Sequence, residues 1–255
     1  MGSVIVAAHL WLEVVPLARN ELWAWSEVSG KLTYPPSLYQ AWLGTQPGVV
    51  ETFLYFLLLP LLATLPFASS LYSDHKSSYV IQLRTRVQYA RYCWAKCLAV
   101  FASAALAVTL PLLLDLCLAA LIVPGLRPEP TAGTFPIFES QLWSALYYAH
   151  PLAYVLLYLF VIAMWAGAIG LLALLFSYVV SNRVLVIISP FACLLFAEFA
   201  LNLVPVEGAS YSPLSFLRPD QPGGARLSIM VVEWCLLMLV VAGVMAWRSR
   251  VDEAL

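Results

Sequence analysis

Charged residues are scarce in this sequence. Asp, Glu, Lys and Arg make up 11% of the 255 residues, whereas soluble globular domains average about 25%. Hydrophobic residues account for 62%, compared with roughly 45–50% in soluble domains, and the mean hydropathy is +0.86. The composition therefore predicts a chain that lies in a bilayer as one unit, over residues 1–255, and it gives no indication of nucleic-acid binding.

The motifs of several enzyme classes are missing. Neither a Gly-x-Ser-x-Gly nucleophile elbow nor a His-Glu-x-x-His zinc motif occurs in the sequence. The one Gly-Lys pair, in "SGKLT", does not match the GxxxxGK[ST] phosphate-binding loop. We therefore expect a chain that is not an enzyme and binds no cofactor or metal itself. Any ATP and Mg²⁺ would be bound by a partner subunit.

Disulfide and zinc frameworks are also missing. The five cysteines lie in or beside apolar segments, cannot all pair, and lack zinc-finger spacing. We interpret them as packing residues. The first residues, "MGSVIVAAHLWLEVV", have no basic region of the kind that begins a cleavable signal peptide.

Six stretches predict membrane-spanning helices, since a helix needs about 20 mostly apolar residues to cross the hydrocarbon layer. They comprise residues 3–18, 49–72, 97–123, 151–176, 184–204 and 227–247. The expected fold is therefore an all-α membrane protein with six transmembrane helices. The connections after the first, third and fifth spans are rich in Pro, Gly, Trp and Tyr, which predicts short interfacial helices and turns.

The positive charges predict the orientation, because cytoplasmic loops carry an excess of Lys and Arg. With six spans the two termini share a side. That side carries eight of the thirteen basic residues, namely Lys76, Arg84, Arg86, Arg91, Lys96, Arg183, Arg248 and Arg250. We therefore expect a multi-pass protein of the cell membrane with both termini in the cytoplasm.

Ionisable residues inside spans are costly and are candidates for function. His9 and Glu13 stand one turn apart on the first span, which favours a mutual or interhelical hydrogen bond, because two ligands do not make a metal site. Asp115 follows Pro111 in the third span, as a polar partner near a helix kink or as part of a substrate path. Glu198 and Asn202 share a face of the fifth span and either line such a path or reach the headgroups.

A basic stretch separates the second and third spans. It reads "SLYSDHKSSYVIQLRTRVQYARYCWAK" and runs from residue 70 to residue 96. Apolar residues recur on one helical stripe while basic ones project elsewhere, which predicts an amphipathic helix at the inner membrane surface. It would bind either anionic lipid headgroups or a cytoplasmic partner protein.

The region from the second to the third span resembles the export permeases of ATP-binding cassette transporters, type-two class, with ABCG-like architecture. The resemblance covers about fifty residues. It is carried by Asp74, Lys76, Tyr79, Arg86, Tyr92 and Lys96, with Ser78 where the family usually has Gly.

The resemblance implies a coupling helix over about residues 76–92 that seats in a groove of an ATP-binding cassette ATPase subunit. Its contact residues would be Tyr79, Leu83, Arg84, Arg86, Val87 and Arg91. It further implies a second permease copy or a paralogue as partner, and a short or re-entrant helix in "SYSPLSFLRPDQPGGA", before the sixth span. The function implied is export of an amphipathic, peptide-like, lipid-like or drug-like substrate, with ATP hydrolysed by the separate subunit.

Two alternatives remain open at this stage. The chain could be a non-catalytic membrane sensor or assembly protein that uses the basic stretch to bind a partner, or a membrane-embedded enzyme whose catalytic residues match no motif. Copurification with an ATPase separates the exporter from both.

Overall fold

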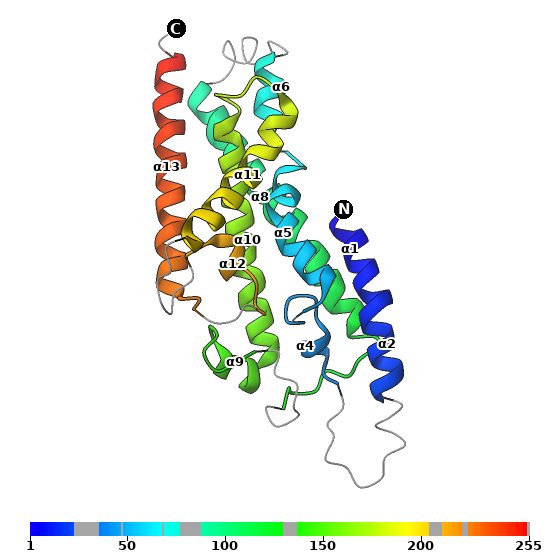
Figure 1. Cartoon of the computed structure of the whole chain (residues 1–255). Helices are drawn as coiled ribbons and strands as arrows, with labels where there is room; N and C mark the ends of the chain where they lie inside the picture. Colours follow the sequence, from blue (N-terminus) through cyan, green and yellow to red (C-terminus); the bar gives the residue numbers. More distant parts are fainter. Residues whose placement is uncertain are drawn as a thin grey trace. The chain divides into compact units, whose positions relative to one another are not determined.

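The structure is a computed structural model, and it describes residues 1–22, 36–46, 48–67, 69–76, 88–129, 137–203, 211–220 and 224–253. Within these ranges the regular secondary structure is entirely helical (Figure 1). The long helices are α5 (Val50–Thr64), α8 (Tyr89–Ala119), α10 (Pro151–Phe176), α11 (Arg183–Asn202) and α13 (Leu227–Glu253). The all-α prediction is thus confirmed for the described residues.

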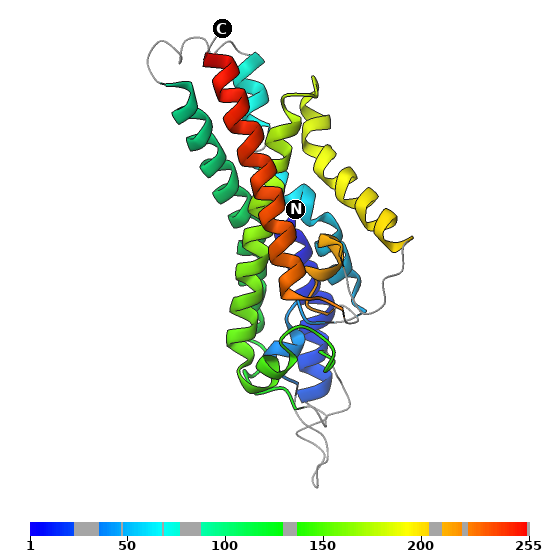
Figure 2. The ribbon, with the colours of Figure 1, turned by 90° about the vertical axis from the view of Figure 1, so that its left-hand side faces the viewer.

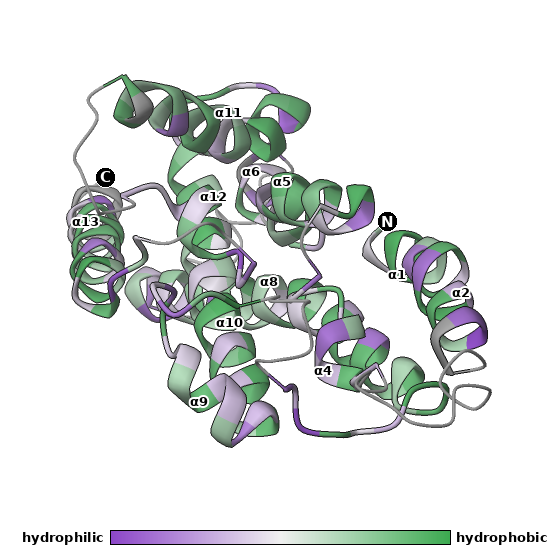
Figure 3. Cartoon of the chain, turned by 60° about the horizontal axis from the view of Figure 1, so that its bottom comes forward, coloured by the Kyte–Doolittle hydropathy of each residue, from purple (hydrophilic) through white to green (hydrophobic). Residues whose placement is uncertain are grey.

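Among the described residues, five helices are long and apolar enough to span a membrane: the amino-terminal helix over Gly2–Asn20, and α8, α10, α11 and α13. The second predicted span contains α5, which has 15 residues and is shorter than the other apolar helices. In Figure 3 the ribbon of α11 is hydrophobic over most of its length. The chain therefore has the helices of a membrane protein.

The boundaries of α10 coincide with the prediction, whereas α8 and α13 extend beyond their apolar parts. The third span was expected from residue 97, but α8 begins at Tyr89, so that Arg91 and Tyr92 belong to this long helix. Residues 89–92 of the predicted coupling helix, about residues 76–92, thus belong to α8. Residues 77–87 lie outside the described residues, so the coupling helix itself stays a prediction. Helix α13 runs without a break to Glu253 (Figure 2), six residues beyond the predicted span.

The second predicted span, residues 49–72, does not form one helix. Helix α5 ends at Thr64, a turn follows, and a separate helix α6 (Ser70–Lys76) begins at Ser70. Pro66 lies in this turn. Proline lacks a backbone N–H and disfavours the helical conformation of the residue before it, which accounts for the break.

The first helix alternates between α and π geometry. It consists of α1 (Gly2–His9), η1 (Leu10–Val14), α2 (Val15–Leu17) and η2 (Ala18–Leu22). Pro16 lies in α2. A proline ring crowds the carbonyl four residues earlier, here that of Leu12, and the wider π turn relieves this clash.

Short helices occupy the three connections for which they were predicted. They are α4 (Leu38–Ala41), α9 (Ser144–Ala149) and α12 (Pro213–Phe216). Helix α4 begins with a capping box, in which the Ser37 and Gln40 side chains bond reciprocally to backbone N–H groups. The four-residue α12 lies in the segment that precedes α13, where the resemblance implied a short helix.

Contacts divide the chain into two compact units. Unit 1 comprises residues 1–57, 109–161 and 204–227, and unit 2 comprises residues 58–108, 162–203 and 228–255. Helices α5, α8 and α10 contribute residues to both units. The expectation of one membrane domain over residues 1–255 stays a prediction.

Unit 1 has an aromatic core. The rings of Tyr147 and Tyr154 lie 5.1 Å apart, as do those of Tyr154 and Tyr158, and all three side chains are buried. Gly2 packs against α8 at Pro111, because a Cβ at position 2 would lie 3.0 Å from Cγ of Pro111. The close approach places the amino-terminal helix against α8.

Unit 2 packs α8 against α10 through small residues. A Cβ on Gly170 would lie 2.7 Å from Cβ of Ala104, so the two helices approach more closely than a larger side chain permits. Cys93 and Cys97 are buried on the same side of α8, in a cluster with residues of α10 and α13. Their burial agrees with the interpretation of these cysteines as packing residues.

Candidate functional site

Polar side chains of unit 2 tie α6 to the beginning of α8. Oδ2 of Asp74 accepts hydrogen bonds from the hydroxyl of Tyr92 and from Nζ of Lys96, the latter at 2.5 Å. Tyr92 and Lys96 are four residues apart on α8 and therefore share a face. We call Asp74, Tyr92 and Lys96 the Asp74 cluster. It connects the two helices that flank residues 77–87.

The Asp74 cluster is partly shielded from solvent. The side chain of Lys96 is 13% exposed and that of Asp74 is 22% exposed. Nζ of Lys96 also lies 5.8 Å from the ring centre of Tyr92 and 5.9 Å from that of Phe67. Aromatic faces attract a cation at such distances. The two rings therefore stabilise the ammonium group of Lys96 in addition to the carboxylate of Asp74.

Apolar packing supports the cluster. Leu71 of α6 is fully buried against Tyr89, Cys93 and Cys97 of α8. The same core includes Leu171 and Leu174 of α10 and Val241 and Met245 of α13. Within unit 2, helix α6 is therefore held against α8 by the buried side chain of Leu71 and by the Asp74 cluster.

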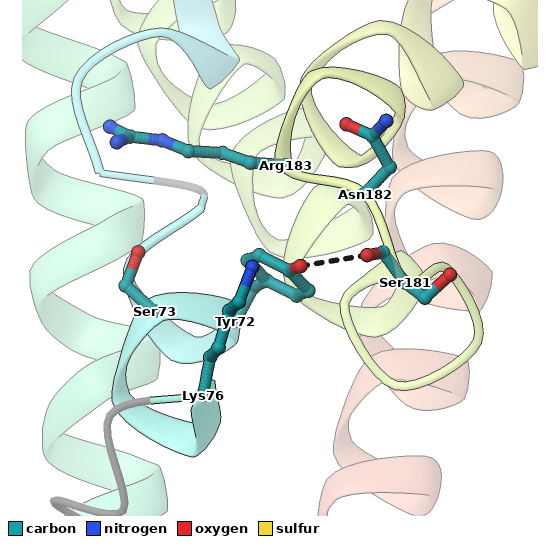
Figure 4. A pocket seen from close by; sticks show the side chains of 6 residues that line it. All are labelled: Tyr72, Ser73, Lys76, Ser181, Asn182 and Arg183. Carbon is teal, nitrogen blue, oxygen red and sulfur yellow. Dashed lines mark hydrogen bonds between the residues drawn. The ribbon is translucent and has the colours of Figure 1, made fainter.

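A cavity of about 540 Å³ lies between α6 and the turn that joins α10 to α11 (Figure 4). We call it the α6 pocket; it is lined by Tyr72, Ser73, Lys76, Ser181, Asn182 and Arg183. The Tyr72 hydroxyl donates to the carbonyl oxygen of Ser181 at 2.7 Å. Nε of Arg183 donates to Oγ of Ser69 at 3.1 Å. These two bonds join the walls of the pocket.

Unit 1 contains a second polar site, built around two fully buried ionisable side chains. Nδ1 of His9 donates to Oδ1 of Asp115 at 2.8 Å, and Nε2 of His9 lies 2.7 Å from Oε1 of Gln46. The backbone N–H of Leu43 donates to the other carboxylate oxygen of Asp115 at 2.9 Å. Both the His9 and the Asp115 side chains are 0% exposed. Each polar atom of this pair thus has a partner, as burial in an apolar interior requires.

The predicted coupling-helix residues are described only in part. Tyr79, Leu83, Arg84, Arg86 and Val87 lie outside the described residues. Arg91 lies in the first turn of α8 and is exposed. Of the other positions that carry the resemblance, the structure brings Asp74, Tyr92 and Lys96 together and places Lys76 at the end of α6.

The three candidates for a substrate path fall in both units. Asp115 belongs to unit 1, and its bonds to His9 and Leu43 agree with the interpretation as a polar partner near a kink. Glu198 belongs to unit 2, lies within α11 and is partly exposed. Asn202 is the last residue of α11, and its side chain is outside the described part of the structure.

Sequence reasoning found His9 and Asp115, the two ionisable members of the buried site, but not their pairing. His9 and Asp115 each stood out as ionisable residues in apolar spans that require a partner, and an interhelical bond of His9 was one of the open alternatives. Gln46 was not identified, because nothing in its sequence context distinguishes it from other polar connection residues. No group of three metal-ligating side chains occurs among the residues that the structure describes.

Comparisons of this chain with protein-family models, with curated proteins and with solved structures give no match.

Proposed function

We propose that this chain is the membrane subunit of an ATP-driven exporter of the ATP-binding cassette type. A separate cytoplasmic subunit binds and hydrolyses ATP with Mg²⁺, and a second copy of this chain or a paralogue completes the transport path. The chain crosses the cell membrane six times, with α5 in the second span and both termini in the cytoplasm. The substrate is amphipathic and peptide-like, lipid-like or drug-like.

The Asp74 cluster is the observation that carries this proposal. An ATPase that drives transport has to move membrane helices by pressing on a cytoplasmic segment. Residues 77–87 follow α6 and precede α8, and Asp74 bonds these two helices to each other on either side of the segment. A force on the segment is therefore passed to both flanking helices together.

The apolar helices support the membrane part of the proposal. In the most apolar stretch of α11, and likewise of α13, only 17% is buried inside the protein. The corresponding stretch of α10 is 61% buried. A helix that leaves most of its apolar surface uncovered needs lipid or another subunit against it. The uncovered surfaces of α11 and α13 are accordingly available for lipid and for a second permease subunit.

Glu198 and Asn202 are the proposed path residues on α11. They lie one turn apart near the end of an apolar helix, which suits recognition of the polar part of an amphipathic substrate. Asp115 is satisfied by His9 and Leu43. In the proposal it therefore holds the first helix against α8, and substrate contact at Asp115 would require these bonds to open.

The test is purification of a tagged chain from the cells that make it, in mild detergent. The expected result is a stable complex with an ATP-hydrolysing subunit in comparable molar amount. If the chain is recovered intact from several detergents and no ATPase accompanies it, the proposal is wrong. A sensor or assembly protein would then account better for the basic segment.

A further inference from the structure

The described residues that line the α6 pocket include two cations and no carboxylate. Lys76 is the last residue of α6, and Arg183 is the first residue of α11. Neither side chain forms an ion pair with another residue of the described chain. The nearby carboxylate of Asp74 is engaged by Tyr92 and Lys96. We propose that the α6 pocket binds the phosphate group of an anionic phospholipid.

The free polar groups of the pocket are mainly donors. Arg183 uses Nε to bond Ser69, which leaves the two terminal nitrogens of its guanidinium group for a ligand. Asn182 uses its side-chain oxygen to accept from the backbone N–H of Val184, which leaves its NH₂ group. Lys76 adds an ammonium group. A phosphodiester has negatively charged oxygens that only accept hydrogen bonds, so it complements this set.

Apolar surface beside the pocket distinguishes a lipid from a free phosphate ion. Val184, Leu185 and Ile188 at the start of α11 are 58%, 54% and 40% exposed. A second hollow, of about 410 Å³, shares Tyr72, Lys76 and Ser181 with the α6 pocket and is also lined by Val179 and Val180. A phospholipid can place its phosphate against the cations and its glycerol and acyl chains along these residues. A free phosphate ion gains nothing from them.

The pocket lies at the ends of apolar helices, where the headgroups of membrane lipids are expected. The apolar helices α5 and α10 end at Thr64 and Phe176, and α11 begins at Arg183. Oγ of Thr64 donates to the carbonyl oxygen of Ile187 at 3.0 Å, which ties the end of α5 to the first turns of α11. Together with the Tyr72–Ser181 and Arg183–Ser69 bonds, this fixes the walls before a ligand arrives, so that little conformational entropy is lost on binding.

The experiment measures lipid binding by the purified full-length chain in a neutral detergent. Phosphatidylglycerol, phosphatidylcholine with the same acyl chains, and inorganic phosphate are each titrated, and bound lipid is counted by native mass spectrometry. The wild-type chain is expected to retain phosphatidylglycerol in preference to phosphatidylcholine. Lys76→Gln combined with Arg183→Gln should weaken phosphatidylglycerol binding at least about tenfold, since each cation contributes to attraction of an anionic headgroup.

Three further variants separate the pocket from general charge effects and from misfolding. Arg19→Gln removes an exposed cation of unit 1 and should leave phosphatidylglycerol binding unchanged. Lys76→Gln alone alters an exposed side chain at the end of α6 and should weaken binding without unfolding the chain, whereas Lys76→Arg should preserve binding. Equal retention of the two lipids by the wild-type chain overturns the proposal. So does undiminished binding in the Lys76→Gln, Arg183→Gln variant, and so does displacement of the lipid by inorganic phosphate at equal concentration.

Discussion

Nδ1 of His9 lies 2.8 Å from Oδ1 of Asp115, although the two residues are 106 positions apart in the sequence. Both side chains are 0% exposed, and the remaining polar atoms bond to Gln46 and to the backbone of Leu43. The first helix is thereby joined to α8 by a polar contact between two buried side chains. A buried pair of this kind specifies one register between two helices, because any slip leaves a carboxylate without a partner.

Replacing His9 with Phe should lower the free energy of unfolding by roughly 3–5 kcal/mol, because Asp115 then stays buried with Leu43 as its remaining partner. Thermal unfolding in detergent measures the effect. Trp11→Phe, which alters a residue 75% exposed on the same helix, is the control and should change stability by less than about 0.5 kcal/mol. Adding Asp115→Asn to His9→Phe should recover stability, because it removes the uncompensated charge. A double variant that is less stable than His9→Phe alone contradicts this account of the pair.

Gly170 and Gly243 provide a matched pair of substitutions in unit 2. Gly170→Ala places a Cβ 2.7 Å from Cβ of Ala104, whereas Gly243→Ala meets no atom within 4 Å. We expect Gly170→Ala to destabilise the chain by about 1–3 kcal/mol through overpacking. Gly243→Ala should stabilise it by up to about 1 kcal/mol through helix propensity. Equal effects on the melting temperature would show that the close approach of α8 and α10 is not needed.

Hydropathy predicted the apolar part of each helix better than its ends. The prediction for α10 was correct because Pro151 is its first residue and apolar residues continue to Phe176. Helix α8 begins eight residues before its predicted start, because its first turns contain polar residues such as Arg91 and Lys96, which hydropathy does not count as part of a span. At about 1.5 Å per residue, its 31 residues span roughly 46 Å, more than the ~30 Å of hydrocarbon.

Local patterns could not identify contacts between distant residues. His9 and Asp115 were each recognisable as costly residues in a span, but their pairing depends on how the first helix packs against α8. Gly2 permits that close approach at Pro111. The sequence likewise identified the members of the Asp74 cluster only as separate positions of one motif, and it did not predict that they contact one another. Its geometry depends on the break after α5, which allows α6 to bring Asp74 to Tyr92 and Lys96.

Asp74→Asn and Lys96→Met should each weaken the connection between α6 and α8. We expect each to reduce substrate-stimulated ATP hydrolysis of the reconstituted complex, with little loss of membrane insertion. Because the two changes remove one shared interaction, the double variant should be about as impaired as either single variant. Additive losses would indicate that Asp74 and Lys96 act separately. Ser144→Ala, which alters a partly exposed residue at the start of α9 in unit 1, is the control.

Leu83→Asp should uncouple ATP hydrolysis from transport more severely than Arg91→Ala. In the proposed docking, Leu83 lies on the apolar stripe that seats in the ATPase, whereas Arg91 is an exposed basic residue. Exposed ion pairs contribute only about 0–1 kcal/mol, and a carboxylate in an apolar contact costs considerably more. Substrate-stimulated ATPase activity in reconstituted membranes is the readout. Loss of stimulation in Arg91→Ala with full stimulation in Leu83→Asp would instead favour an electrostatic contact with lipid.

The most direct test of the exporter proposal compares the wild-type chain with its Arg84→Glu, Arg86→Glu variant, each purified through the same tag from the cells that make the protein. The measurement is ATP hydrolysis per mole of purified chain, together with the amount of ATPase subunit recovered. The account predicts that wild-type preparations contain the ATPase and hydrolyse ATP, while the variant inserts normally and loses both. Equal recovery of the ATPase by the two preparations, or no ATP hydrolysis with the wild-type chain, would contradict it.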